Sequence, residues 1–243
     1  MIDVNINIGM LSGIPCQVVP KPTAQGRRGR PKAADSTPQQ DILETALVAF
    51  ATYGYDGVSV RTLNRGLGVS HNLIYQRFGS KDDLWRASVD FGFSPLLRIM
   101  QGIFDPTLTE PLEQLRLAIR NYVVFSANHP ELVALMNIEA RQDTDRLAYI
   151  YDNYIQPALT GVGRLLVYLA ERKTIRPIAL REFHFLVAHG AAAIYSLVPL
   201  ATLFDPANPC DPAAIEEHAR LVSDLVVEGL RLEPKSAEVN LKH

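Results

Sequence analysis

Hydrophobic residues recur at every third or fourth position over most of the chain, which is the spacing of one face of an α-helix. The first clear run lies between Thr37 and Gly54 and contains Ile42, Leu43, Ala46, Leu47, Phe50 and Tyr53. Thr37 supplies a capping residue and Pro38 a proline at the first helical position. Because glycine commonly ends helices, the pattern predicts a first helix that stops at Gly54.

The same spacing predicts five later helices, with prolines in the breaks between them. We expect these helices at residues 111–126, 130–140, 145–172, 178–203 and 212–231. No convincing set of segments alternates polar and apolar residues as β-strands do. The sequence therefore predicts an all-α protein.

One apolar stretch is long enough to cross a bilayer. Residues 183–204 contain no Asp, Glu, Lys or Arg. However, the stretch includes His184, His189 and Pro199, and no basic cluster flanks it. A helix that is apolar all round is also typical of a buried element or a subunit interface. We therefore interpret it as a buried helix and expect no membrane association.

Charge is distributed unevenly along the 243 residues. The chain has a net charge of −2, yet residues 1–40 hold five basic and two acidic residues. All five basic residues fall between Lys21 and Lys32, with no carboxylate among them. Such a run repels itself and cannot enter a core, so we expect residues 1–36 to form a disordered basic arm. A basic front on an acidic body indicates that any contact with nucleic acid is made at one end.

The segment from Val58 to Leu84 has the pattern of a helix-turn-helix. Ser59 can cap a short helix, and Gly68 can supply the left-handed residue of a tight turn. Ser70 can then cap a second helix. Ser80 and Asp83 have the spacing of a capping box that starts a third helix.

The residues of this segment resemble those of the tetracycline-repressor (TetR) family of transcription regulators. The resemblance runs from Thr37 to about Leu84 and is carried by Gly68, Val69, Ser70, Ile74, Tyr75, Phe78, Ser80, Lys81 and Leu84. It implies a three-helix DNA-binding domain at residues 37–92 and a helical ligand-binding and dimerisation domain at residues 93–232, followed by a flexible tail at 233–243. It also implies a homodimer that represses transcription from a palindromic operator in double-stranded DNA.

The resemblance assigns roles to individual side chains. Arg61 is at the position that reaches a base edge or a phosphate, and Tyr75 and Lys81 match phosphate contacts. The start of the recognition helix would enter the major groove, where Leu73 could touch a thymine methyl group. The expected DNA-binding residues of this unit are Arg61, Ser70, His71, Asn72, Leu73, Tyr75, Arg77 and Lys81.

The basic arm contains a second DNA-binding pattern. Residues 28–31 read Arg-Gly-Arg-Pro, which resembles the AT-hook core that lies in A·T-rich minor grooves. Arg28 and Arg30 would meet the negative potential of the groove. A generic tether to phosphates remains the alternative.

The second domain resembles the family only in its architecture. That architecture implies that the last two helices pair with their copies as a four-helix bundle. It also implies a cavity for a largely apolar small molecule among the helices at 111–172. Its expected lining is drawn from Tyr122, Phe125, Met136, Tyr149, Tyr154 and His184, which could equally be plain core residues.

A joint is expected between the two domains. Gly92 weakens a helix, and Pro95 removes an internal hydrogen bond. The sequence therefore predicts a kink or break near residues 92–95, through which bound ligand would move the recognition helices.

No catalytic motif accompanies these features. His184 and His189 are five positions apart, off the one-face spacing of a helical metal pair. We expect no enzymatic activity, no cofactor and no metal. In the absence of a recognisable signal peptide we expect a cytoplasmic protein. A ligand-independent architectural DNA-binding protein, using the arm and the helix-turn-helix, is the alternative function.

Overall fold

The computed structural model describes residues 37–70, 72–103 and 110–232 of the chain. The expected basic arm with Arg28 and Arg30, His71 and the expected tail at 233–243 lie outside the described residues. Within those residues the secondary structure is helical and contains no strand, which confirms the all-α prediction.

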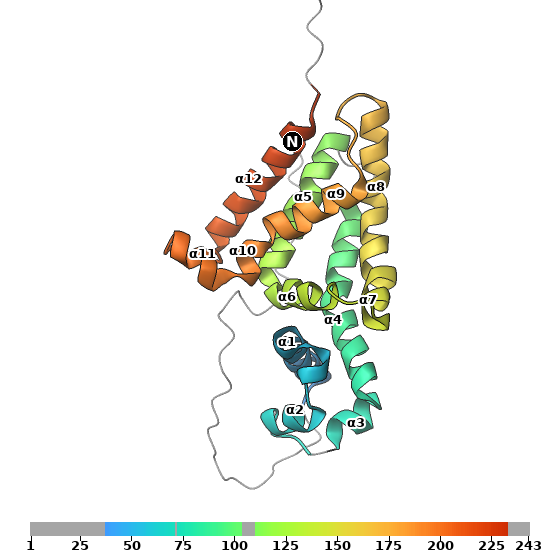
Figure 1. The fold of residues 1–243 in the computed structure, drawn as a ribbon, viewed down its shortest axis with the longest axis vertical. Coiled ribbons are helices and arrows are strands. Elements are labelled where there is room, and N and C mark those ends of the chain that lie inside the picture. The colour runs from blue at the N-terminus through green and yellow to red at the C-terminus, as the bar shows by residue number, and fades with distance from the viewer. Residues whose placement is uncertain (1–36, 71, 104–109, 233–243) are drawn as a thin grey trace, which may run out of the picture.

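The first four helices form the lower part of the molecule in Figure 1. One longer helix and two short ones gather there, and a long fourth helix rises from them into the body. These are α1 (Gln39–Gly57), α2 (Val60–Gly66), α3 (Leu73–Phe78) and α4 (Lys81–Ile103).

The remaining helices form the body above them. The elements are α5 (Pro111–Asn128), α6 (Pro130–Glu139), α7 (Asp145–Ile150), the π-helix η2 (Tyr151–Ile155), α8 (Gln156–Glu171), α9 (Leu180–Phe185), the π-helix η3 (Leu186–Ala191), α10 (Ala193–Ser196), α11 (Val198–Phe204) and α12 (Pro212–Leu230). Helices α4, α5 and α8 stand roughly upright, while α9 and α10 cross them (Figure 1).

Local signals in the sequence set several helix ends. Gly54 interrupts α1 with a φ of 68°, as its predicted stop requires. The Ser80 hydroxyl accepts a hydrogen bond from the Asp83 backbone N–H at 3.0 Å and donates to the Asp83 carboxylate, which confirms the predicted capping box. Thr37 makes no such cap, because α1 begins one residue later and Pro38 occupies the N-cap position.

Of the predicted kink or break near residues 92–95, the break is wrong, because α4 stays helical from Lys81 to Ile103 with Pro95 inside it. Ser94 Oγ donates to the Asp90 carbonyl one turn back at 2.5 Å. Gly92 serves close packing instead of flexibility. A Cβ at that position would lie 2.6 Å from Leu132 Cδ2 and 3.0 Å from Leu47 Cδ2. The residue is therefore the point where α1, α4 and α6 meet.

The prediction of one buried helix over 178–203 is also wrong. The segment divides into α9, η3, α10 and α11, and the last of these starts with a proline in its first turn. Helix α11 has no buried residue, and Phe204 is 86% exposed. In the parts of the chain that the structure describes, no helix has the length and apolar character to cross a membrane.

Two hydrophobic cores hold the molecule together. One lies within the body and is built mainly by α5, α8 and α12. The other joins the first four helices to α6 and includes Phe125, Leu132, Leu135 and Ile150 from the body. The lower domain and the body therefore share a core across α1, α4 and α6, so a change in one can reach the other through packing.

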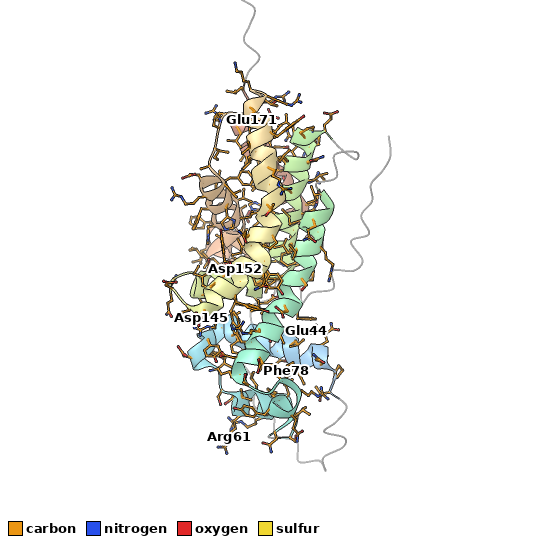
Figure 2. The ribbon with its side chains drawn as sticks, turned by 90° about the vertical axis from the view of Figure 1, so that its right-hand side faces the viewer. Glu44, Arg61, Phe78, Asp145, Asp152 and Glu171 are labelled. Carbon is orange, nitrogen blue, oxygen red and sulfur yellow. The ribbon has the colours of Figure 1, made fainter. Side chains whose placement is uncertain are left out.

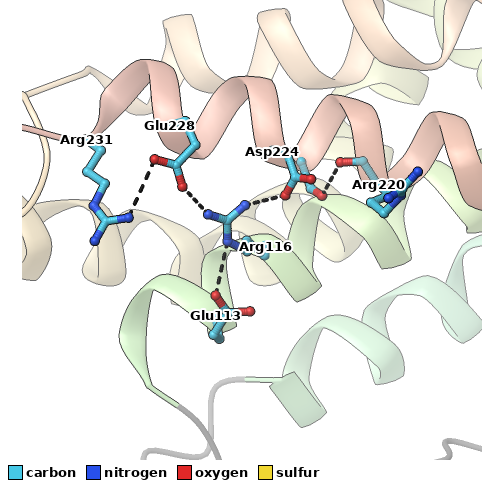
Figure 3. A network of polar contacts seen from close by, with 7 residues as sticks. Glu113, Arg116, Arg220, Asp224, Glu228 and Arg231 are labelled. Carbon is cyan, nitrogen blue, oxygen red and sulfur yellow. Dashed lines mark hydrogen bonds and ion pairs between the residues drawn. The ribbon is translucent and has the colours of Figure 1, made fainter.

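Ion pairs fasten α12 to α5 (Figure 3). Arg116 of α5 is mostly buried and binds three carboxylates, Glu113 on its own helix and Asp224 and Glu228 on α12. Arg120 of α5 pairs with Glu216 near the start of α12. The last helix is thus held along its length by charged contacts as well as by the core.

Candidate nucleic-acid interface and ligand cavity

The turn between α2 and α3 has the geometry of a helix-turn-helix. Gly68 adopts a φ of 67°, as expected for the left-handed residue of the turn. The Val69 N–H donates to the Asn64 carbonyl at 3.0 Å and closes the turn. Ile74 of α3 is fully buried against the shared core, so α3 is fixed on α1 and α4 by one face.

Four of the expected DNA-binding residues come together on one surface. Arg61, Asn72, Tyr75 and Lys81 line a single hollow, whose floor also includes Val58 and Val60. Tyr75 is 50% exposed although it is aromatic, and Arg61 lies at the far lower end of the molecule in Figure 2. An exposed set of cationic and hydrogen-bonding side chains at a helix-turn-helix can bind phosphates and base edges.

Lys81 is held within this hollow by its neighbours. It is the first residue of α4, and its Nζ lies 4.2 Å from the centroid of the Tyr55 ring. The Tyr55 hydroxyl donates to Asp82 Oδ1 at 2.5 Å. Burial and the hydrogen bond to Asp82 raise the pKa of Tyr55 to about 12, so the hydroxyl remains a donor at neutral pH.

Three other expected DNA-binding residues that the structure describes, Ser70, Leu73 and Arg77, do not line this hollow. Leu73 is 3% exposed and packs in the shared core, so the predicted contact with a thymine methyl group is wrong. Leu73 is the first buried apolar residue of α3. Its position in the sequence alone did not show whether it lies on the buried side or on the DNA-facing side of that helix. Ser70 is exposed beside the turn but does not cap α3, whose N-cap is Asn72. Arg77 Nη1 donates to the Thr37 carbonyl at 2.6 Å, which ties α3 to the start of α1.

A cavity of about 110 Å³ lies inside the body. Five of the six side chains expected at a ligand site line this cavity, namely Tyr122, Phe125, Met136, Tyr154 and His184. Tyr149, the sixth, does not line it. Helix α4 also lines the cavity, through Leu96, Leu97 and Met100. This contribution was not predicted, because Gly92 and Pro95 favour a joint in that segment.

The cavity wall is mostly apolar and carries few polar groups. Ser126, Asn137, His184 and His189 are among them. Burial lowers the pKa of His184, and the charge of His189 adds to this, so the neutral imidazole is favoured. A neutral imidazole offers one donor and one acceptor to a ligand. Across the described residues no three His, Cys, Asp or Glu side chains gather as metal ligands.

Tyr149 points toward α4 instead of the cavity. Its hydroxyl donates to Asp90 Oδ1 at 2.7 Å, and its ring lies edge-on to Trp85 with centroids 6.1 Å apart. Tyr154 lines the cavity and donates to the same Asp90 oxygen at 2.5 Å. Asp90 therefore joins the cavity wall to the helix that carries Lys81.

The fold and the exposed face together define a helix-turn-helix DNA-binding protein with a helical regulatory domain. Two family models match the chain: "Bacterial regulatory proteins, tetR family" over residues 42–87, and "Tetracyclin repressor-like, C-terminal domain" over residues 111–226. The chain belongs to the TetR family of transcriptional regulators.

Individual proteins resemble parts or all of the chain. The HTH-type transcriptional repressor AcnR of Corynebacterium glutamicum is 43% identical over 49 residues, which is 20% of this chain and 26% of AcnR. The match thus spans about a quarter of that relative's length. The transcriptional regulator FadR of Bacillus subtilis, solved with stearoyl-CoA, superposes with a TM-score of 0.58 at 16% identity, over 80% of this chain and 100% of FadR. AibR, solved with isovaleryl coenzyme A and operator DNA, gives a TM-score of 0.54 at 18% identity, over 79% of this chain and 97% of AibR. These two structures share the fold.

Proposed function

We propose that the chain is a dimeric repressor that binds a palindromic operator and is released from it by a small, largely apolar molecule. The observation that carries the proposal is the hollow formed by Arg61, Asn72, Tyr75 and Lys81 on the exposed side of the helix-turn-helix. In this role Arg61 reads a base edge, while Tyr75 and Lys81 bind phosphates. The protein acts in the cytoplasm, where bacterial DNA is accessible.

The cavity favours a ligand-responsive repressor over a purely architectural DNA-binding protein. It lies directly above the shared core, and three of its lining residues, Phe93, Phe125 and Leu132, belong to that core. An occupant would therefore press on the residues that position α4. FadR and AibR were solved with acyl-CoA molecules, so acyl-CoA thioesters are the first ligands to test.

The exposed apolar surface favours a homodimer. Leu221 and Leu225 project from α12, and Leu200, Leu203 and Phe204 project from α11. Helices α11 and α12 lie on the same side of the body in Figure 1. Isolated surface leucines are ordinary, but five exposed large apolar side chains on two helices of one side favour an interaction surface. A two-fold dimer requires a two-fold symmetric DNA site.

A binding-site selection tests the DNA-binding role. The wild-type protein should select a palindromic sequence from a random duplex pool. Arg61→Ala should relax the preference at one base position of each half-site by about 1–3 kcal/mol. Lys81→Ala and Tyr75→Phe should instead weaken binding to all sequences alike. A selection on Arg61→Ala that returns the wild-type motif unchanged would contradict the role of Arg61 in base reading.

The basic arm needs a separate test, because it lies outside the described residues. Replacing Arg28 and Arg30 with alanine should weaken binding most where A·T pairs flank the site. An equal loss with G·C flanks would leave only the phosphate tether.

A further inference from the structure

Tyr55 lies between the DNA-binding face and the body. It is close to the end of α1, immediately after the interruption at Gly54. Two cations lie over its ring: Lys81 Nζ at 4.2 Å from the centroid and Arg146 Cζ also at 4.2 Å. Lys81 begins α4 at the DNA-binding hollow, while Arg146 belongs to α7 of the body. One aromatic ring therefore touches a side chain from each domain.

Arg146 is held by a buried carboxylate. Its Nε donates to both oxygens of Glu139, at 3.1 and 3.3 Å, and Glu139 is 3% exposed. Glu139 is the last residue of α6, the helix whose Val133, Met136 and Asn137 line the cavity. A buried carboxylate that pairs with an arginine fixes that arginine, because separating the pair would leave an uncompensated charge.

The ring itself is also fixed in place. Its plane is 9° from that of Phe50, with centroids 6.0 Å apart, and its hydroxyl donates to Asp82. Asp82 follows Lys81 directly in the chain. The arrangement therefore holds the start of α4 at two points, the Lys81 ammonium over the ring and the Asp82 carboxylate at its edge.

We propose that Arg146 and Tyr55 are positioning residues for the phosphate contact of Lys81, so that α6 governs DNA affinity through Glu139, Arg146 and Tyr55. This inference rests on the proposed DNA-binding role of Lys81. It requires no ligand, because the free protein already contains the chain of contacts. This chain of contacts from Glu139 to Lys81 consists of polar and cation–aromatic interactions and passes through α7 and α1. It is separate from the apolar packing around Gly92.

Arg146→Gln tests the route in the full-length protein. Binding is measured by fluorescence anisotropy on the duplex that the wild type selects, and on unrelated duplex DNA at low salt. A phosphate contact is independent of sequence, so Arg146→Gln should lower affinity by the same factor, roughly two- to tenfold, on both duplexes. The slope of log affinity against log salt should fall by about one for each protomer, that is by about two for the dimer on the selected palindrome. In the Lys81→Gln background, Arg146→Gln should have no further effect.

Two further variants separate positioning from charge. Glu139→Gln removes a negative charge, so long-range electrostatics alone would make the variant bind DNA more tightly. Because the change also releases Arg146, the proposed route predicts weaker binding instead. Tyr55→Phe keeps the ring and should retain more affinity than Tyr55→Leu, which removes it. Arg172→Gln is the matched control. Arg172 directly follows α8, and its guanidinium lies 4.5 Å from the centroid of the Tyr168 ring. Its neighbour Glu171 lies at the opposite end of the molecule from Arg61 in Figure 2, so this variant should leave DNA affinity unchanged. Thermal unfolding of each variant confirms that binding is measured on folded protein.

The outcomes distinguish the inference from the proposed function. Wild type that binds no duplex DNA overturns the proposed function, and the inference with it. If wild type binds DNA but the losses of affinity caused by Arg146→Gln and Lys81→Gln simply add, the inference alone is overturned. Tighter binding by Glu139→Gln would have the same consequence.

Discussion

Gly92 is a residue at which side chains from two other helices pack directly against the backbone of α4. The space for its missing Cβ is filled by methyl groups of Leu132 from α6 and Leu47 from α1. Small shifts of α6 caused by an occupant of the cavity would act directly on α4 at this point, because close-packed groups cannot absorb them. A glycine that looked like a flexible joint in the sequence is instead a tight contact between the domains.

Gly92→Ala should destabilise the protein by about 1–3 kcal/mol, because the added methyl group overpacks this contact. Gly102→Ala on the same helix is the control, since a Cβ there meets nothing within 4 Å. That change should be neutral or stabilise by up to about 1 kcal/mol through helix propensity. Chemical denaturation of both variants measures the difference. Equal stabilities would show that α6 and α4 are not tightly packed at Gly92.

Tyr149 should make stability depend on pH in the alkaline range. Burial and the hydrogen bond to Asp90 raise its pKa to about 12, above the value of about 10 for an unfolded tyrosine. Its contribution is therefore complete below pH of about 10 and is lost as the pH rises toward 12. Tyr149→Phe should cost about 1 kcal/mol at neutral pH, because Asp90 keeps its bond from Tyr154. Its melting temperature should then fall less steeply than that of the wild type between pH 10 and about 12, the unfolded and the folded pKa of Tyr149. Parallel curves would contradict this.

At the residue scale, the sequence predicted what is set locally. The left-handed Gly68 and the Ser80 capping box depend on neighbours within a few positions, and both are present. Leu73 and Tyr149 depend on distant partners. Leu73 packs under α1 and α4, and Tyr149 is drawn to Asp90, 59 positions away. Periodicity gives the face of a short helix only approximately, so these two assignments failed.

At the scale of elements, α12 is positioned by charge as well as by its apolar face. Arg116 contacts three carboxylates, two of them on α12, and the side chain is itself largely shielded from water (Figure 3). Removing the arginine would take the shared counter-charge away from Asp224 and Glu228 and leave Glu228 with Arg231 alone, at 3.5 Å. Since α12 contributes to the proposed dimer surface, its placement bears on assembly.

Arg116→Ala should reduce stability by about 1 kcal/mol, a modest amount because its three carboxylate partners are half exposed. The loss should shrink in high salt, which screens the wild-type pairs. Arg181→Ala is the control, because Arg181 is highly exposed and pairs only with its neighbour Glu182. It should change stability by less than about 0.5 kcal/mol. Urea denaturation at low and high salt distinguishes the two, and a salt-independent loss for Arg116→Ala would argue against the ionic contribution.

Helix boundaries followed the sequence where proline or glycine marks them. Helices α5, α6 and α12 begin at Pro111, Pro130 and Pro212, as predicted. The prediction of a single buried helix at 178–203 failed because the apolar residues of this segment lie in two different environments. Some pack into the body core, Val198 at the start of α11 among them, while Leu200, Leu203 and Phe204 of α11 are exposed. Hydrophobicity alone does not separate a buried core helix from an interface helix.

At the scale of the whole molecule, the proposed dimer places two DNA-binding faces on one duplex. Leu225→Glu should disrupt the dimer, because Leu225 is 66% exposed on α12 and a carboxylate there would be buried in the interface. Sedimentation should show a monomer, and affinity for the selected palindrome should fall at least about tenfold. Val167→Glu is the control on α8, where Val167 is similarly exposed outside the proposed interface. A Leu225→Glu protein that remains dimeric would place the interface elsewhere.

Occupancy of the cavity and affinity at the DNA-binding face are expected to be coupled. The direct test is the affinity of wild type for its selected duplex with and without a saturating molecule that raises the melting temperature of the protein. The occupant should weaken DNA binding about 5- to 150-fold, and DNA should weaken the occupant's binding by the same factor. An occupant that binds the protein and leaves DNA affinity unchanged would show that the two sites are not coupled.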